Sequence, residues 1–187
     1  AVHHANCNHL EAGETHVPPR SDSPIGRRVA LLSQRLGSGP YGVLSLFTHL
    51  VLGWPLYLLF GVAGGESYGS PTSHFWNGAP FHNGRQSLFP ASFRPAMLRS
   101  NLGIAAMLLA LAVASAHFSV LRVLAVYGLP YLVINAWLVT YTWLQHTDTD
   151  IPHFSTSNWT WAKGALQTVD RPYGPVLNLL HHGIGST

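Results

Sequence analysis

Residues 100–121 read SNLGIAAMLLALAVASAHFSVL and contain no Asp, Glu, Lys or Arg, although Arg99 and Arg122 bracket them. A second uncharged run, VLAVYGLPYLVINAWLVTYTWLQHT, follows at 123–147. Each run reaches the ~20 apolar residues that a membrane-spanning helix needs. In lipid, only a helix satisfies its own backbone hydrogen bonds over this length. The sequence therefore predicts two spanning helices, at 100–121 and 123–145.

The linker between these runs is short, so the two helices are expected to form an antiparallel hairpin. The segments before and after the hairpin then lie on the same side of the membrane. A buried hairpin of a soluble domain is the alternative. A third apolar stretch occupies 41–63, with Gly53 and Pro55 in its middle. These residues leave two interpretations open, a span or a kinked interfacial helix.

The composition also favours a membrane protein. Apolar residues make up 47% of the chain and charged residues 9%, against about 25% charged in a typical soluble domain. The net charge of +3 is scattered, which argues against a nucleic-acid-binding patch.

Cys7 is the single cysteine, so no internal disulfide forms, and it is expected to be an unpaired thiol. The 187 residues fit one domain or part of one. Since the sequence does not start with Met, we expect a fragment of a longer protein.

Histidine is the residue type that points to chemistry, at 12 of 187 residues. His3 and His4 are adjacent, and neighbours on a helix point ~100° apart, which suits two metal ions lying close together. His146 lies at the polar end of the second predicted span, where ionisable groups usually have a role. His182 completes the candidate metal site, and His153 is a weaker candidate. Imidazole ligands of this kind suit zinc, copper or iron. For any single histidine, a surface residue without a ligand role is the alternative.

Motifs of other enzyme classes are weak in the sequence. It contains no P-loop. GESYG at 65–69 and GSGPYG at 37–42 match the strings G-x-S-x-G and G-x-G-x-x-G, but both motifs need a preceding strand, which the predicted helices do not supply. Nucleophilic hydrolysis and nucleotide binding are therefore disfavoured.

Several stretches resemble one family, the membrane acyl-lipid fatty acid desaturases, and most closely its Δ12 (oleate) group. The family carries three histidine boxes. The stretches that match family segments are AVHH at 1–4, like the end of the second box H-x-x-H-H, VLGWPLYL at 51–58, YGLPYLVINAWLV at 127–139, LQHTD at 144–148 and LQTVDR at 166–171. The tail LHHGIGST at 180–187 resembles the segment that leads into the third box, H-V-A-H-H. The resemblance covers nearly the whole chain.

The resemblance implies an all-α integral membrane protein, with a transmembrane helical hairpin and interfacial helices, as a fragment of the histidine-box desaturase fold over residues 1–187. It implies two iron ions and O₂-dependent insertion of a cis double bond into an acyl chain. His3 and His4 would be iron ligands and His146 an additional one. His153 and His182 match recurrent family histidines of less clear role. The substrate-binding residues are not identified.

The resemblance also suggests partners and location. The expected substrate is a membrane lipid acyl chain, such as phospholipid-linked oleate. Electrons would come from NADH through cytochrome b5, or from ferredoxin in a plastid form. The endoplasmic reticulum is the favoured membrane, with the histidines on the cytosolic face. Because two boxes would lie outside the sequence, the fragment itself is expected to be inactive.

Other functions stay open at this point. An ω-3 desaturase, or a fatty acyl hydroxylase or acetylenase of the same scaffold, would share these motifs. A non-enzymatic polytopic membrane protein, whose histidines bind zinc or nothing, is the alternative from a different class.

Overall fold

The computed structural model describes residues 2–62, 64–65, 67, 72–76 and 88–185. Ala63, at the end of the third apolar stretch, and Ser186 and Thr187, at the end of the tail, lie outside the described residues. The described residues form helices and loops, with one isolated parallel bridge between His9 and Phe154. The prediction of an all-α protein is confirmed for this part of the chain.

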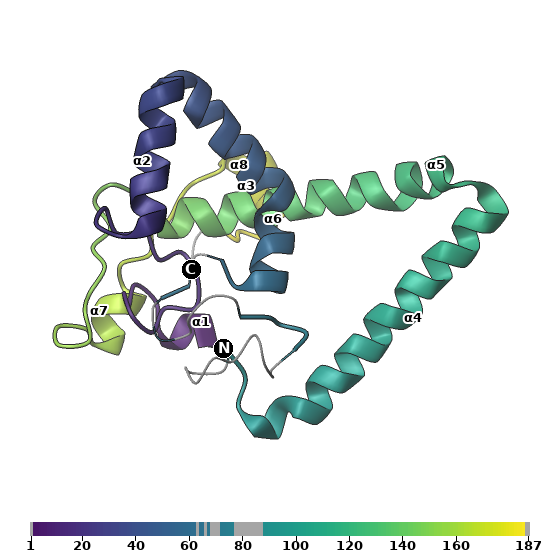
Figure 1. The fold of residues 1–187 in the computed structure, drawn as a ribbon, viewed down its shortest axis with the longest axis horizontal. Coiled ribbons are helices and arrows are strands. Elements are labelled where there is room, and N and C mark those ends of the chain that lie inside the picture. The colour runs from purple at the N-terminus through teal and green to yellow at the C-terminus, as the bar shows by residue number, and fades with distance from the viewer. Residues whose placement is uncertain (1, 63, 66, 68–71, 77–87, 186–187) are drawn as a thin grey trace.

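The helices follow one another in a simple order (Figure 1). They are α1 (Val2–Ala5), α2 (Pro24–Leu36), α3 (Ser38–Phe60), the 3₁₀ turn η1 (Ala91–Phe93), α4 (Arg94–Phe118), α5 (Val120–Val123), the π-helical turn η2 (Leu124–Gly128), α6 (Leu129–His146), α7 (Trp161–Ala165) and α8 (Gly174–Leu180). Three continuous helical stretches of the described chain are long and apolar enough to cross a membrane: Ser38–Phe60, Ala91–Phe118 and Val120–His146.

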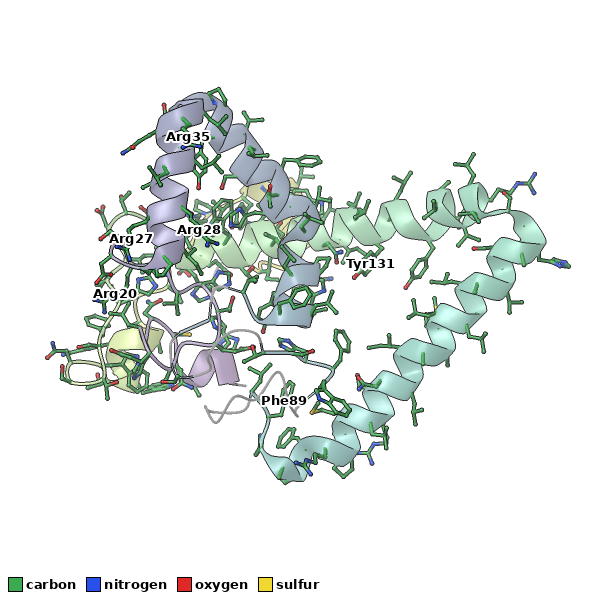
Figure 2. All side chains as sticks on the ribbon, in the orientation of Figure 1. Arg20, Arg27, Arg28, Arg35, Phe89 and Tyr131 are labelled. Atoms are coloured by element: carbon green, nitrogen blue, oxygen red, sulfur yellow. The ribbon has the colours of Figure 1, made fainter. Side chains whose placement is uncertain are left out.

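Helix α4 and the continuous helical stretch of α5, η2 and α6 meet at a corner formed by Ser119. Ser119 has a positive φ of 83°, and its hydroxyl accepts a hydrogen bond from the backbone N–H of Arg122 at 3.5 Å, which caps α5. From this corner the two helices diverge into an open V (Figure 1), and no Cα atom of α4 lies within 8 Å of one of α6. The expected pair of consecutive apolar helices is present, but the two helices do not pack against each other. Their apolar side chains project outward, as Figure 2 shows for α4.

A second corner joins α2 to α3. The hydroxyl of Ser23 accepts a hydrogen bond from the N–H of Gly26 at 3.0 Å, and Pro24 occupies the first turn of α2, where its missing N–H costs nothing. Gly37, with a φ of 81°, separates α2 from α3. This positive φ favours glycine, so the sharp change of direction is encoded locally.

Helix α3 crosses α6 rather than running beside it (Figure 1). At the crossing, a Cβ added to Gly53 would lie 3.5 Å from a methyl group of Val139. The ring of His49 stacks on that of Trp143, with centroids 4.5 Å apart. A methyl group at Gly53 would therefore make an ordinary contact with α6, whereas a larger side chain would not fit between the two helices.

The N-terminal loop packs against the chain that follows α6. The N–H of Leu10 donates to the carbonyl of Phe154 at 2.9 Å, and the N–H of Phe154 donates to the carbonyl of Asn8 at 2.8 Å. Gly164 approaches the loop so closely that a Cβ there would lie 2.2 Å from the carbonyl oxygen of Cys7. Buried residues of the described chain gather at this end of α6, among them Cys7, Asn8, His9, Glu14, Tyr141 and His146. The most protected region is therefore polar and rich in histidine.

Candidate metal centre

Two predicted ligands from opposite parts of the chain face each other. His3 lies on α1, and His146 is the last residue of α6; their Nε2 atoms are 3.1 Å apart. His146 is only 7% exposed. Two imidazole nitrogens at right angles around one metal ion would lie about 3 Å apart, given a metal–nitrogen bond of about 2.1 Å. The separation of these two atoms therefore fits a shared metal ion.

Two more imidazoles surround this pair. The ring of His4 meets that of His3 edge-on, with centroids 5.3 Å apart. The ring of His16 stacks on that of His146 at 5.0 Å and meets His3 edge-on at 5.6 Å. Residues His3, His4, His16 and His146 are called the histidine cluster below. His16 was not predicted, because it stands alone in a Pro-containing loop without the spacing of a histidine box.

The thiol of Cys7 lies beside the cluster. Its sulfur and the ring nitrogens of His3 and His146 all lie within 4.8 Å of one another. The thiol donates to the carbonyl of His3 at 3.4 Å, and burial raises its pKa. The sequence predicted an unpaired thiol; Cys7 is indeed free, but it lies at the site.

The charge state of the cluster suits metal binding. Burial lowers the pKa of His3, and it lowers the pKa of His16 to about 3, with the neighbouring His146 and His3 adding to the effect. Burial disfavours the charged imidazolium form in both cases. Neutral imidazoles keep a lone pair for a metal ion at neutral pH.

A buried carboxylate stands next to the cluster. Glu14 accepts a hydrogen bond from the hydroxyl of Tyr57 and lies 3.4 Å from Nε2 of His74. These contacts and the nearby His3 outweigh desolvation and lower the pKa of Glu14. Its negative charge in turn opposes the effect of burial on the pKa of His3 and His16. Glu14, Tyr57 and His74 are called the carboxylate network below.

The remaining predicted ligands take different places. Nε2 of His153 lies 3.2 Å from the carbonyl oxygen of His16, so His153 is at the edge of the cluster. His182 is exposed, and no contact links it to the cluster in the described chain. Its neighbour His181 packs on the rings of Trp137 and Tyr141. The structure thus brings His3, His4, His146 and His153 near one another but not His182, and the ligand roles stay predictions.

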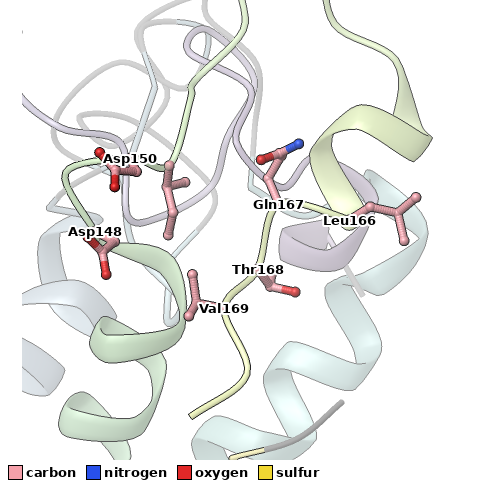
Figure 3. A pocket seen from close by; sticks show the side chains of 7 residues that line it. Asp148, Asp150, Leu166, Gln167, Thr168 and Val169 are labelled. Atoms are coloured by element: carbon pink, nitrogen blue, oxygen red, sulfur yellow. The ribbon is translucent and has the colours of Figure 1, made fainter.

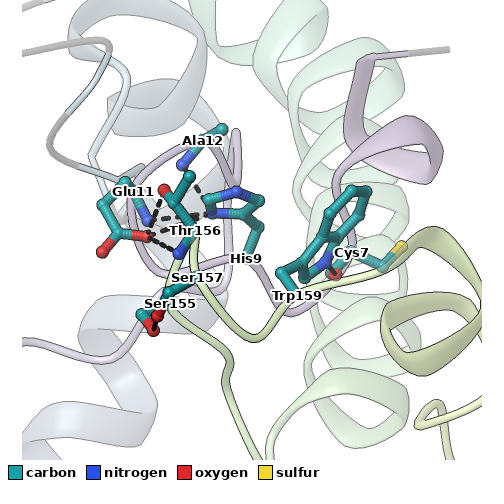
Figure 4. A network of polar contacts seen from close by, with 8 residues as sticks. All are labelled: Cys7, His9, Glu11, Ala12, Ser155, Thr156, Ser157 and Trp159. Atoms are coloured by element: carbon teal, nitrogen blue, oxygen red, sulfur yellow. Dashed lines mark hydrogen bonds and ion pairs between the residues drawn. The ribbon is translucent and has the colours of Figure 1, made fainter.

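A further network holds the N-terminal loop in place (Figure 4). Nδ1 of His9 accepts from the backbone N–H groups of Glu11 and Ala12 at 3.2 and 3.1 Å. A carboxylate oxygen of Glu11 accepts from the N–H of Thr156 at 3.1 Å, and the indole N–H of Trp159 donates to the carbonyl of Cys7 at 2.9 Å. Since Nδ1 of His9 is engaged with the backbone, we assign this network a structural role.

A pocket of about 300 Å³ lies beyond the end of α6 (Figure 3). It is lined by Asp148, Asp150, Ile151, Leu166, Gln167, Thr168 and Val169. Asp148 is engaged in an ion pair with Arg171 at 2.5 Å, which lowers its pKa. None of the predicted metal ligands lines this pocket, so it is distinct from the histidine cluster.

Comparison with known proteins identifies relatives along almost the whole chain. It is 38% identical over 185 residues to the Δ12 fatty acid desaturase of Arabidopsis thaliana, covering 99% of this chain and 45% of that protein. It is 36% identical over 181 residues to an endoplasmic reticulum omega-6 fatty acid desaturase isozyme of Glycine max, covering 96% of this chain and 43% of that protein. It is 38% identical over 185 residues to the oleoyl-12-hydroxylase of Ricinus communis, covering 99% of this chain and 44% of that protein.

The chain thus spans less than half the length of these curated relatives. No family model matches it, and no solved structure matches it. The resemblance drawn from the sequence motifs is confirmed by the desaturase relatives.

Proposed function

We propose that this chain, a homologue of plant Δ12 fatty acid desaturases over 99% of its length, is a metal-binding part of a membrane desaturase that places a cis double bond in a lipid-linked acyl chain. The single observation that carries the proposal is the 3.1 Å approach of His3 to His146 inside a cluster of four imidazoles. It brings together a residue of the N-terminal motif and the residue at the end of an apolar helix, as a shared metal site requires.

The donor set of the cluster fits iron. Imidazole nitrogen is a common iron ligand, and the neutral state of His3 and His16 leaves their lone pairs available. We propose His3, His4 and His146 as ligands, with His153 as a weaker candidate. His182 remains a candidate on the resemblance alone. Two iron ions with O₂ would supply the oxidising power of the reaction.

The overall chemistry removes two hydrogen atoms from adjacent methylene groups of the acyl chain. O₂ is reduced to two waters by these hydrogens together with two electrons and two protons from outside. In this proposal NADH, through cytochrome b5, supplies the electrons at the endoplasmic reticulum membrane, with the cluster on the cytosolic face. The chain's own residues hold the metal ions at the end of α6, where an acyl chain can enter from the bilayer.

Burial of part of the cluster supports this role. His146 and Cys7 are almost completely covered, His3 and His16 are half-buried, and His4 is exposed. The covered side of the site keeps bulk water away from reactive species.

A second candidate, an oleate hydroxylase, is favoured by one specific observation. The Ricinus communis oleoyl-12-hydroxylase is 38% identical to this chain, as similar as the desaturase of Arabidopsis thaliana. The two activities would use the same cluster and differ in the fate of the acyl carbon.

The test is to express the complete reading frame in yeast and to profile the fatty acids. We expect linoleate to appear, and to disappear in His4→Ala and in His146→Ala. His117→Ala is the matched control, because His117 is exposed at the far end of α4, and it should keep the product.

Other products in this experiment would indicate a different activity. A hydroxylated fatty acid would show that the protein is a hydroxylase rather than a desaturase. A double bond at another position would keep the desaturase activity but change the proposed position of the double bond. A protein that makes no new fatty acid and purifies without iron would overturn the proposal in favour of a non-enzymatic membrane protein.

A further inference from the structure

We propose that Glu14 is the internal counter-ion of the metal centre, a positioning residue that is held by Tyr57 and His74 and balances the positive charge that metal ions bring to the histidine cluster. This inference rests on the proposed function, because it assumes that the cluster binds metal.

Burial of Glu14 is the first observation. Its side chain is only 8% exposed, and a carboxylate this well covered is stable only when it is paired and hydrogen-bonded. Its partners in the carboxylate network are a neutral phenol, which donates a hydrogen bond, and an imidazole at 3.4 Å. The network contains no Lys or Arg, so the carboxylate lacks a permanent positive partner within it.

The second observation is the way in which the network is built. His74 packs on the ring of Tyr57, with centroids 4.5 Å apart. The N–H of His74 donates to the carbonyl of Leu58 at 2.9 Å, and the N–H of Thr72 donates to the carbonyl of Phe60 at 3.1 Å. Both residues that hold Glu14 are therefore fixed to the C-terminal end of α3.

The loop that carries Glu14 is also held by the chain that follows α3. The N–H of Gly65 donates to the carbonyl of Gly13 at 2.7 Å. A Cβ at Gly64 would lie 2.9 Å from the carbonyl oxygen of Glu14, and one at Gly65 would lie 2.4 Å from that of Glu11. This close backbone approach holds Glu14 at one position relative to the cluster.

The third observation is the charge balance. The cluster contributes four imidazoles that are neutral when they bind metal, so metal ions would bring uncompensated positive charge into a partly covered site. Glu14 is a buried carboxylate two residues before His16, whose ring lies 5.0 Å from that of His146 and 5.6 Å from that of His3. Charges interact strongly in such a poorly hydrated region. A fixed anion there favours metal binding, and it favours the ferric over the ferrous state.

Glu11 offers a matched control in the same loop. It is also a hydrogen-bonded glutamate, but its side chain is 36% exposed and it accepts from the N–H and the hydroxyl of Thr156 (Figure 4). Replacing Glu11 removes the same charge and a comparable number of hydrogen bonds, three residues away from Glu14.

The experiment uses the complete protein, purified in detergent and titrated anaerobically with Fe²⁺ alone. Glu14→Gln should lower the Fe²⁺ affinity about 10- to 100-fold, the usual effect of removing an outer-shell partner of metal ligands. It should also raise the midpoint potential of the iron. Glu14→Asp, which keeps the charge, should stay closer to the wild-type potential than Glu14→Gln, and Glu11→Gln should leave both properties unchanged.

Wild-type affinity and potential in Glu14→Gln would overturn the inference and leave Glu14 as a purely structural link. An equal loss in Glu11→Gln would overturn it as well. If Glu14→Gln does not fold, Tyr57→Phe keeps the carboxylate but releases one of its two partners. Because it keeps the charge and changes how the carboxylate is held, it should shift the potential by less than removal of the charge would, and an unchanged potential contradicts the inference. Failure of the wild-type protein to bind iron would instead reject the proposed function.

Discussion

Burial and crowding by other imidazoles determine how His16 responds to protons. Its ring contacts those of His146 and His3, and a proton on a neighbouring ring disfavours a proton on His16. Burial is the larger cause, and together these effects lower the pKa of His16 from 6.5 to about 3. Without a metal ion, the folded site therefore favours a neutral ring at His16.

We predict that the metal-free protein loses stability as the pH falls from 7 to 4. The pKa of His16 is depressed in the folded state, so the unfolded chain binds more protons in this window. The free energy of unfolding then rises with pH, and the contribution of His16 is fully present above pH 6.5 and is lost as the pH falls toward 3. Thermal unfolding of chelator-treated protein at several pH values measures the effect. His16→Gln should flatten the slope, while His117→Gln should not; an unchanged slope in His16→Gln would contradict the assignment.

The sequence pointed to part of the cluster only, and the ligand roles of these histidines stay predictions. His3, His4 and His146 were identified from adjacency and from position at the end of an apolar run. His16 and Glu14 carry no such local signal. They approach the cluster because the N-terminal loop folds back, which depends on backbone contacts to residues more than a hundred positions away, such as Phe154.

At the scale of elements, the two long helices α4 and α6 were predictable because long uncharged apolar runs produce them locally. Helix α2 was not predicted, because it lies in the polar N-terminal part of the chain, although Pro24 and Gly37 mark its ends. The packing of the long helices was not predictable in the same way. The hairpin expectation assumed that consecutive helices lie side by side, whereas Ser119 turns the chain into an open V, and α6 packs on α3 instead.

The α3–α6 crossing provides a prediction of its own. The Cβ of an alanine at Gly53 would sit 3.5 Å from Val139, an ordinary contact, so Gly53→Ala should be nearly neutral. Gly53→Leu must push the helices apart, and overpacking of this kind costs about 1–3 kcal/mol. The midpoint of thermal unfolding in detergent measures the difference.

Gly42 is the control for this substitution. It lies on the same helix, and a Cβ there would meet nothing within 4 Å. Gly42→Leu should leave the unfolding midpoint near that of the wild type. Equal destabilisation by both leucines would mean that the crossing is not the cause.

At the scale of the whole molecule, the site determines how the chain sits in a membrane. Contacts between His3 and His146 place the N-terminal loop on the side where α6 ends. The hydrogen bond between Tyr57 and Glu14 places the C-terminal end of α3 on that side too. If Val120–His146 spans the membrane, as we expect, Ser119 at the corner of the V lies on the opposite side.

Helix α3 is long enough to cross, but its surroundings argue against it. If Ser38 lay on the far side, the chain between the N-terminal loop and Ser38 would have to cross as well. The helix in that segment is α2, whose 13 residues extend about 20 Å, short of the ~30 Å hydrocarbon core. It also carries Arg27, Arg28 and Arg35 (Figure 2), which are costly in lipid. We therefore expect α3 to lie in the interface with both ends on the side of the histidine cluster.

Cysteine labelling tests this topology in sealed microsomes of the Cys7→Ser protein, with a membrane-impermeant maleimide. Ser157→Cys, in the exposed turn after α6, reports the side of the site. Ser38→Cys should label from that same side, and Ser119→Cys only after the membrane is permeabilised. Labelling of Ser38→Cys together with Ser119→Cys would mean that α3 spans the membrane. The chain from the N-terminal loop to Ser38 would then have to cross as well, which would carry the three arginines of α2 through the hydrocarbon core.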